Sequence, residues 1–503
     1  MPPLRIIDVH GVYQSMDFQK LLSRGIVVCV SVSVLLGPWF FGAWETWWFW
    51  PFLIPVFAAS LLLGLQLILC PNMSAGSTPG GNPSGRTDTA PTDFIPRPAR
   101  FLVCGVPFLV YAYLRFLTTP VYIDAERSFL LFLSSWLLML VVLYGLTARQ
   151  RQGLFAAICI NLVLIGLYGW INHRITGSRL VLWADGFPQY YGENRASACF
   201  FCPDHFSGAM EFCMCLGLGF VFGGAVRFPL RLAGCAMCVI GLIGVVMSKS
   251  RGGGMTLVVI AIAASIWGLT HLPRKARWWW RLSAFSCVLM LILLFASLAK
   301  PYMSRFGAYF DWSQARGKPA TEAIQAVWES VRHQSRPQMY GAAIRAWKTA
   351  PWLGIGPGMH ESVWPRFGPT ADGDPENAIW PSRVNLEQTS NEVHSDWLEL
   401  LEEFGVVGFA LFLVPFVLLM LQFVRAMRQD PRRERIRAAT GEFAENDWAD
   451  AIVLGVFLAL VAITFHSLGD FNLQIPALAW VMASLTALGF AAMQDNPTDP
   501  NSP

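Results

Sequence analysis

Charged residues are scarce in this chain of 503 residues, since Asp, Glu, Lys and Arg together make up only 14% of it. Soluble domains carry about 25% of such residues, so this chain cannot cover a soluble surface with charge. Hydrophobic residues make up 54% of the sequence, and apolar runs of about 17–22 residues, long enough to cross a bilayer, recur along it. The composition predicts an integral membrane protein with many spans.

Several signatures of other protein classes are missing as well. The sequence contains no Walker loop, no dinucleotide-binding fingerprint and no nucleophile elbow. The net charge of +4 does not indicate nucleic acid as a partner, because the basic residues are spread over loops. Most of the eleven cysteines lie in apolar segments, as small buried hydrophobic residues do. Cys199 and Cys202 lie in a loop, where a disulfide is conceivable; zinc with His205 is less so, because no fourth ligand is evident.

The apolar runs predict an all-α membrane protein with about twelve transmembrane helices. The polar leader 1–24 has no clear cleavage site after it, so the first run is interpreted as a retained span rather than a signal peptide. Trp clusters at 44–50 and 278–280 fit aromatic belts at span ends. The predicted spans lie at 25–41, 48–70, 101–117, 128–147, 154–172, 206–225, 232–248, 254–271, 283–299, 398–424, 450–467 and 475–493.

Three parts follow from this order of spans. Residues 1–300 hold spans one to nine and include a Pro-, Gly- and Ser-rich stretch at 71–100, which is typical of a flexible linker. Residues 301–395 form one large loop between spans nine and ten, and residues 396–503 hold the last three spans and a tail. Lys and Arg concentrate in one set of alternating loops, which predicts that these loops, the linker and both termini are cytoplasmic. The outward-facing, periplasmic set then comprises 174–205, 249–253, 301–395 and 468–474.

Arg251 is the first candidate functional residue in the outward set. It follows a tight turn between two spans and precedes three glycines, so it is held at membrane level. Charge at that depth is costly and usually functional, and glycines let a backbone and a ligand approach closely. A snorkelling arginine that anchors the interface is the alternative interpretation.

Arg336 begins a second candidate segment. Arg336, Tyr340, Ala343 and Trp347 share one helical face, which predicts an amphipathic helix on the outer leaflet. There the guanidinium could bind a phosphate in bidentate geometry; contact with a lipid headgroup is the alternative. The helix passes into LGIGPG at 353–358, which we expect to be a turn that exposes backbone N–H groups.

His394 immediately precedes Ser395, Asp396 and an apolar helix. A histidine at a membrane entrance is a natural general base. A lone histidine is more often structural, but two outward arginines favour a reaction site. Weaker signals come from Arg195, which could bind sugar, and from His466, which could line the same cavity although a structural hydrogen bond fits it better. The acidic pair at 372 and 374 is typical of a solvated turn.

Taken together, these segments resemble the O-antigen ligase and polymerase superfamily of bacterial membrane proteins. The resemblance rests on RPQMY at 336–340, PWLGIGPG at 351–358 and HSDWLELLEEFGVVG at 394–408, with SRGG at 250–253, CPDHFSG at 202–208 and HSLGDFNLQIPA at 466–477. The motifs occur in order over 195–477. Ser395 and Asp204 stand where the family usually has Asn, and Tyr340 where Trp is common.

The resemblance implies an inverting glycosyltransferase that needs neither metal nor cofactor. Such enzymes pass a glycan from undecaprenyl pyrophosphate to an acceptor hydroxyl outside the cytoplasmic membrane. Carried over, His394 is the catalytic base, and Arg251 and Arg336 bind the donor pyrophosphate. Aromatic-lined clefts between spans would hold the lipid tail. Lipopolysaccharide biosynthesis by ligation to lipid A core, polymerisation of a growing glycan, and transfer to protein stay open as reactions. A lipid-linked glycan exporter or flippase is the alternative from another class, but clustering of the candidate groups on one face favours the enzyme.

Overall fold

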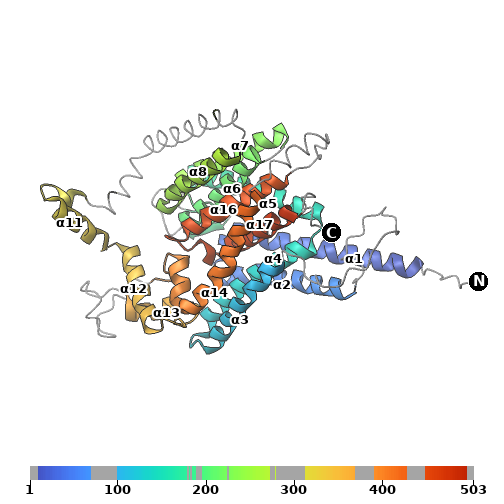
Figure 1. Cartoon of the computed structure of the whole chain (residues 1–503), viewed down its shortest axis with the longest axis horizontal. Helices are drawn as coiled ribbons and strands as arrows, with labels where there is room; N and C mark the ends of the chain where they lie inside the picture. Colours follow the sequence, from blue (N-terminus) through green and yellow to red (C-terminus); the bar gives the residue numbers. More distant parts are fainter. Residues whose placement is uncertain are drawn as a thin grey trace, which may run out of the picture.

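The computed structural model describes residues 9–69, 99–177, 180–181, 184–188, 195–223, 226–271, 278, 307, 312–332, 334–368, 390–427 and 448–494. Within these, long helices form a bundle, and shorter helices extend from one end of it (Figure 1). The N-terminal end of α1 points away at the opposite end of the view. The predicted linker 71–100 lies almost wholly outside the described residues, as does the predicted span 283–299.

The first half of the bundle is built from eight long helices and one hairpin. A π turn at Val32–Leu36 extends the first helix, and another at Val141–Gly145 extends the fourth. The elements are α1 (Val9–Ser31), α2 (Thr46–Leu69), α3 (Ala99–Thr118), α4 (Tyr122–Leu140), α5 (Ala148–Thr176), β1 (Leu180–Val181), β2 (Ala184–Pro188), α6 (Pro203–Phe222), α7 (Phe228–Ser248) and α8 (Arg251–His271).

The second half contains the loop helices and the last three long helices. The elements are α11 (Ala320–Arg332), α12 (Ser335–Thr349), α13 (His360–Phe367), α14 (Asp396–Met427), α16 (Ala449–His466) and α17 (Pro476–Gln494). Helices α11–α13 lie at the left end of Figure 1, beyond the end of α14. They belong to the predicted large loop, which therefore carries helical structure of its own.

Eleven of the described helical segments are long and apolar enough to cross a membrane. Each coincides with a predicted span to within a few residues at most ends, which confirms the all-α membrane fold. The start of α1 differs, because the helix already begins at Val9 within the polar leader. Further along α1, Leu22 is buried and Ser23 hydrogen-bonds Gln150, which packs this part of the helix on the bundle. The short antiparallel hairpin β1–β2 was not predicted.

Helices α6, α16 and α17 form the centre of the bundle. Their side chains are mostly buried, whereas α2, α3, α7 and α14 expose many Leu, Ile and Val side chains as lipid-facing helices do. Small residues allow the central backbones to approach closely: a Cβ added at Gly219 of α6 would lie 2.3 Å from the carbonyl oxygen of Ala451 in α16. This core holds α6 and α16 in register, and both helices carry residues of the candidate site.

Helix α14 is interrupted at Gly405, which has φ +64°. The turn after α12 closes the break: Ile355 and Gly356 donate to the carbonyls of Glu402 and Glu403 at 3.0 Å each. On the far side of the break, Val406 and Val407 donate to carbonyls of the same turn, those of Pro351 and Trp352, at 3.0 and 3.1 Å. Four backbone hydrogen bonds therefore fasten α12 and its turn to α14.

Candidate active site

Loops that are far apart in the sequence meet at the end of the bundle where α12 lies. The backbone N–H of Asp396 donates to the carbonyl of Asp470 at 3.2 Å, and the Tyr340 hydroxyl donates to the carbonyl of His394 at 3.1 Å. The segment before α6 joins the turn between α7 and α8, since Ala196 N–H donates to the carbonyl of Met247. Parts of all four stretches predicted to face outward thus lie together.

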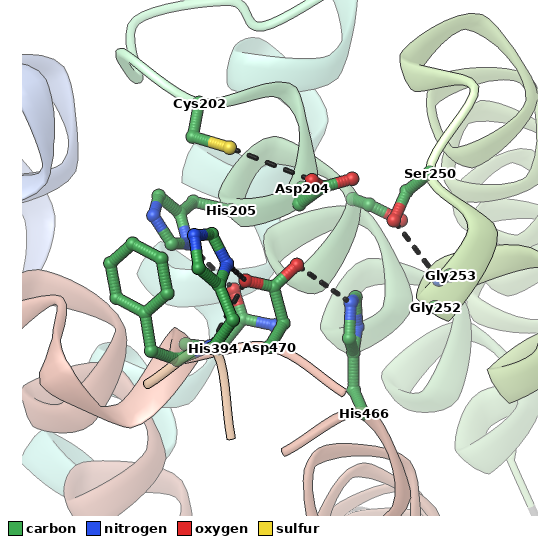
Figure 2. Close-up of polar contacts among 12 residues, drawn as sticks. Cys202, Asp204, His205, Ser250, Gly252, Gly253, His394, His466 and Asp470 are labelled. Atoms are coloured by element: carbon green, nitrogen blue, oxygen red, sulfur yellow. Dashed lines mark hydrogen bonds and ion pairs between the residues drawn. The ribbon is translucent and has the colours of Figure 1, made fainter. Parts of the chain in front are cut away.

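The carboxylate of Asp470 is the centre of this site. His394 Nδ1 lies 3.4 Å from Oδ1, and Arg336 Nη2 lies 3.2 Å from Oδ2. On the other side, His466 Nε2 lies 3.9 Å from Oδ2. Figure 2 shows the His394 and His466 rings directed towards Asp470 from different segments. One buried carboxylate therefore joins the predicted base to one of the predicted cationic residues.

Asp204, in the first turn of α6, extends the network. Arg336 Nη2 contacts its Oδ2 at 3.3 Å, and Arg195 Nη2 contacts its Oδ1 at 2.7 Å. Arg195 also donates through Nε to the carbonyl of Ser248 at 2.8 Å. Two guanidinium groups and two carboxylates thus alternate, which compensates the cost of burying each charge.

This alternation fixes the charge states of the loop residues. Burial would raise the pKa of Asp470, but Arg336 and then His394 favour its ionised form and hold that pKa well below its ordinary value. Burial would lower the pKa of Arg336, but the Asp470 and Asp204 carboxylates outweigh it and raise that pKa. The ion pair stays charged throughout the physiological pH range.

Only some members of the network are open to a substrate. The side chains of His394 and Arg336 are 21% and 17% exposed, whereas those of Asp470 and Arg195 are 0% and 5% exposed. Both ion pairs of Arg336 use Nη2, and within the described part of the chain no hydrogen bond involves its Nη1 or Nε. Arg336 therefore has N–H donors available for an anion, while Arg195 and His466 lie behind the exposed pair.

The conformation of His394 is constrained by its surroundings. Its φ of +59° lies in the left-handed region, which is uncommon for a residue with a side chain. Its ring packs edge-on against Phe471, with centroids 4.7 Å apart, and His205 packs on the same phenyl ring at 4.6 Å. His205 is in turn held by Asn472, 3.0 Å from Nδ1. Such packing fixes the imidazole in one orientation.

Arg251 is half-buried and begins α8 beside this network. A Cβ on the following residue, Gly252, would lie 2.8 Å from His466 Nε2, and one on Gly253 would lie 2.0 Å from Ser207 Oγ. These glycines therefore make room for protein side chains. They bring the backbone next to Arg251 against the site, and the interpretation that the three glycines admit a ligand stays a prediction.

The expectation of free backbone N–H groups at 353–358 was wrong. The N–H groups of Ile355 and Gly356 are taken by α14 carbonyls, because the break at Gly405 leaves those carbonyls without helical partners. The turn is thus a structural connection. Arg115 from α3 reinforces it by donating to the carbonyl of Gly354 at 3.0 Å.

The structure also bears on the cysteine pair and on metal binding. Cys199 and Cys202 are both buried free thiols, and the Cys202 thiol donates to Asp204 Oδ2 at 3.7 Å. Among the described residues, no group of three His, Cys, Asp or Glu side chains is arranged to hold a metal ion. The acidic pair at 372 and 374 lies outside the described residues.

The sequence reasoning missed the central position of Asp470. A spacing of four from His466 would suit one helical face, but the Ser-Leu-Gly between the two residues is typical of a turn, and α16 ends at His466. It also missed His360, which is buried and contacts Glu402 at 2.9 Å and Ser390 at 3.3 Å. That contact ties α13 to α14 close to the loop that leads to His394.

An apolar cavity of about 250 Å³ lies next to the site between α3, α4, α14, α16 and α17. Aromatic and aliphatic side chains line most of it, including Phe108, Trp136 and Phe412. Asp396 and Leu473, both close to Asp470 in the network, line it as well. The cavity thus extends from the polar site into the apolar part of the bundle.

A comparison with known families bears on the class of this site. Residues 236–413 match the family model described as O-antigen ligase. In this segment, which is less than half of the chain, the protein is similar to that family. The match and the eleven membrane-length helices among the described residues support a multi-pass membrane glycosyltransferase of the O-antigen ligase and polymerase type. No curated protein matches the chain.

The O-antigen ligase match covers part of the site. It spans Arg251, Arg336 and His394, which lie on α8, α12 and the loop before α14. Asp204 and Asp470 lie outside the matched segment, but the structure joins both to Arg336.

Proposed function

We propose that the protein transfers a glycan from undecaprenyl pyrophosphate to an acceptor hydroxyl at the periplasmic face of the cytoplasmic membrane. One observation carries this proposal: the partly exposed imidazole of His394 and the partly exposed guanidinium of Arg336 contact the two oxygens of one buried carboxylate, Asp470. A base and an anion-binding group held within one network match what the transfer requires.

In this proposal, His394 is the general base. Its Nδ1 faces Asp470, so the carboxylate stabilises the tautomer with a proton on Nδ1 and leaves Nε2 to accept a proton. The acceptor hydroxyl gives its proton to Nε2 as its oxygen bonds to the anomeric carbon. The bond from that carbon to the pyrophosphate oxygen breaks on the opposite face, and the electron pair leaves with undecaprenyl pyrophosphate. The configuration at the anomeric carbon is inverted.

Arg336 and Arg251 are proposed to stabilise the leaving pyrophosphate. Arg336 offers unused N–H donors, and charge-assisted hydrogen bonds to phosphate are among the strongest in proteins. Negative charge grows on the pyrophosphate as it departs, so cations fixed in advance lower the barrier without a metal or other cofactor. The burial of Arg195 and His466 favours a positioning role over direct contact with substrate.

The apolar cavity supports a lipid-linked donor. Its lining suits an isoprenoid chain, and its position beside Asp396 would keep the pyrophosphate near the Asp470 network. A lipid-linked glycan exporter would instead be expected to carry charged groups along a path through the membrane. The gathering of the ionisable site residues at one end of the bundle supports the enzyme.

The decisive test uses purified protein with lipid-linked glycan extracted from cells that lack this gene. We expect wild-type protein to transfer the glycan to acceptor material from the same cells, and His394→Gln to lower the rate by about 10²–10⁴-fold, the usual contribution of a general base. His173→Gln is a matched control, since His173 lies on α5 outside the network. Transfer by His394→Gln at the wild-type rate would contradict the proposal. The identity of the molecule to which the glycan becomes attached also distinguishes ligation, polymerisation and transfer to protein.

A further inference from the structure

A second polar cluster adjoins Phe471, the phenyl ring on which His394 packs. The Trp44 ring lies 5.8 Å from the Phe471 ring, which itself packs on His394. The guanidinium of Arg127 sits 4.3 Å from the centre of the Trp44 ring and donates a hydrogen bond to the Trp44 carbonyl. An aromatic and guanidinium pair is therefore reached from the predicted base through one phenyl ring.

Carboxylates surround this pair without pairing with it directly. Four of them interact electrostatically with Arg127: Glu45, Asp124, Glu361 and Glu392. Yet among the described residues Arg127 forms no ion pair, and its hydrogen bonding is limited to the Trp44 carbonyl. Arg127 therefore keeps N–H donors near carboxylate acceptors. A hydroxyl group suits such a combination, because it can accept from the guanidinium and donate to a carboxylate.

The balance of charge in the cluster is negative. Arg127 supplies one positive charge against four carboxylates, and it does not neutralise them. Burial and then the Asp124 and Glu392 carboxylates raise the pKa of Glu361 despite His360 and Arg127 nearby. The network around Asp470 instead balances two guanidinium groups with two carboxylates, and Arg251 lies beside it. The two clusters therefore suit different ligands.

From this arrangement we infer that Trp44, Arg127, Glu45 and Glu392 form the acceptor subsite, and that the receiving sugar is neutral or amine-bearing and carries no phosphate. The inference rests on the proposed function. Inversion requires the acceptor oxygen and the leaving pyrophosphate on opposite faces of the anomeric carbon, so His394 should lie between their sites. Carboxylates accept hydrogen bonds from sugar hydroxyls or an ammonium group, whereas a phosphate among them meets repulsion.

The test titrates the two substrates separately in the purified system. In Glu392→Gln and Glu45→Gln, which keep side-chain size, we expect the KM for the acceptor fraction to rise by about tenfold or more, the scale of losing a hydrogen bond to a charged group. The KM for the lipid-linked donor should stay unchanged. Trp44→Leu should also raise the KM for the acceptor fraction, because it removes the aromatic surface.

Two neighbouring residues supply matched controls. Trp47 lies three residues after Trp44 and is 59% exposed, and Glu126 precedes Arg127 and contacts Tyr122. Trp47→Leu and Glu126→Gln should leave both KM values unchanged. Mass spectrometry of the product should show a receiving sugar without phosphate.

The outcomes separate this inference from the proposed function. No transfer by wild-type protein would defeat both. Transfer with an unchanged acceptor KM in the Glu45 and Glu392 variants, or with the change confined to the donor, would overturn the subsite alone. A phosphorylated receiving sugar would overturn its charge class.

Discussion

At the scale of single residues, the site depends on a division between exposed and buried groups. His394 and Arg336 reach the surface, and the buried Asp470 holds both in place. A buried carboxylate with two cationic partners is strongly coupled to them, because removing its charge leaves a partly desolvated guanidinium without compensation. Asp470 is therefore a positioning residue in our proposal, acting on the substrate through others.

Replacing Asp470 with Asn should expose this dependence. We expect turnover to fall by about 10–100-fold, as for loss of a group that orients a ligand or base, with a smaller change in donor KM. Asp450→Asn, at the other end of α16, should have little effect. An Asp470→Asn enzyme with wild-type turnover would show that the base needs no such orientation.

The ionisation of Asp470 should also affect how the stability of the protein depends on pH. Its folded pKa lies below the unfolded value, so the stability it contributes is fully present above the unfolded pKa of about 3.9 and is lost as pH falls through the folded value. We expect wild-type and Asp470→Asn protein to differ in Tm by a constant amount between about pH 5 and 8. A difference that disappears within that window would mean that Asp470 is not held ionised.

At the scale of elements, the break in α14 is the most specific structural feature. Gly405 has a positive φ, and a Cβ there would lie 2.4 Å from the Trp352 carbonyl oxygen. Neither the backbone conformation nor the space accommodates another residue.

Gly405→Ala should therefore destabilise the protein by more than about 2 kcal/mol, within the range for substitutions at strained positions, and lower its Tm. Gly64→Ala is the control, since a Cβ at that helical position meets nothing within 4 Å. It should be neutral or stabilising by up to about 1 kcal/mol. Equal Tm values for the two variants would argue against the closed break. Thermal unfolding in detergent measures both.

At the scale of the whole molecule, the packing of the central helices positions the residues of the site. Asp204 begins α6 and His466 ends α16, and the two helices meet through glycines along their length. A larger side chain at this contact should push the two ends of the network apart.

Gly219→Val should therefore reduce the yield of folded protein in the membrane, because its side chain would overlap the α16 backbone. Gly153→Val, on α5 with open space around it, should fold normally, because valine has a slightly higher helix propensity than glycine. Normal yield and activity of the Gly219 variant would contradict the close contact. Size-exclusion chromatography of solubilised protein provides the measurement.

How much the sequence predicts differs between these scales. Length and apolar composition locate the membrane helices well, because crossing a bilayer dictates both. The break in α14 and the hairpin depend on contacts between distant segments, which hydropathy does not encode. Likewise, motif spacing identifies Arg336 and His394 as candidates. Their shared contact with Asp470 depends on the folded structure and cannot be predicted from spacing.

The fastening of α12 to α14 also bears on how the site opens. Arg336 stands on α12 and His394 directly precedes α14, so the hydrogen bonds at the break in α14 keep the elements that carry these two side chains together. Asp470 lies in the loop between α16 and α17, and further hydrogen bonds join this loop to the start of α14: Asp396 N–H donates to the Asp470 carbonyl, and the Ser467 hydroxyl donates to Asp396. Any opening that lets a bulky glycan enter or leave between these elements would have to break those bonds, and it would withdraw the base and the guanidinium from Asp470 at the same time.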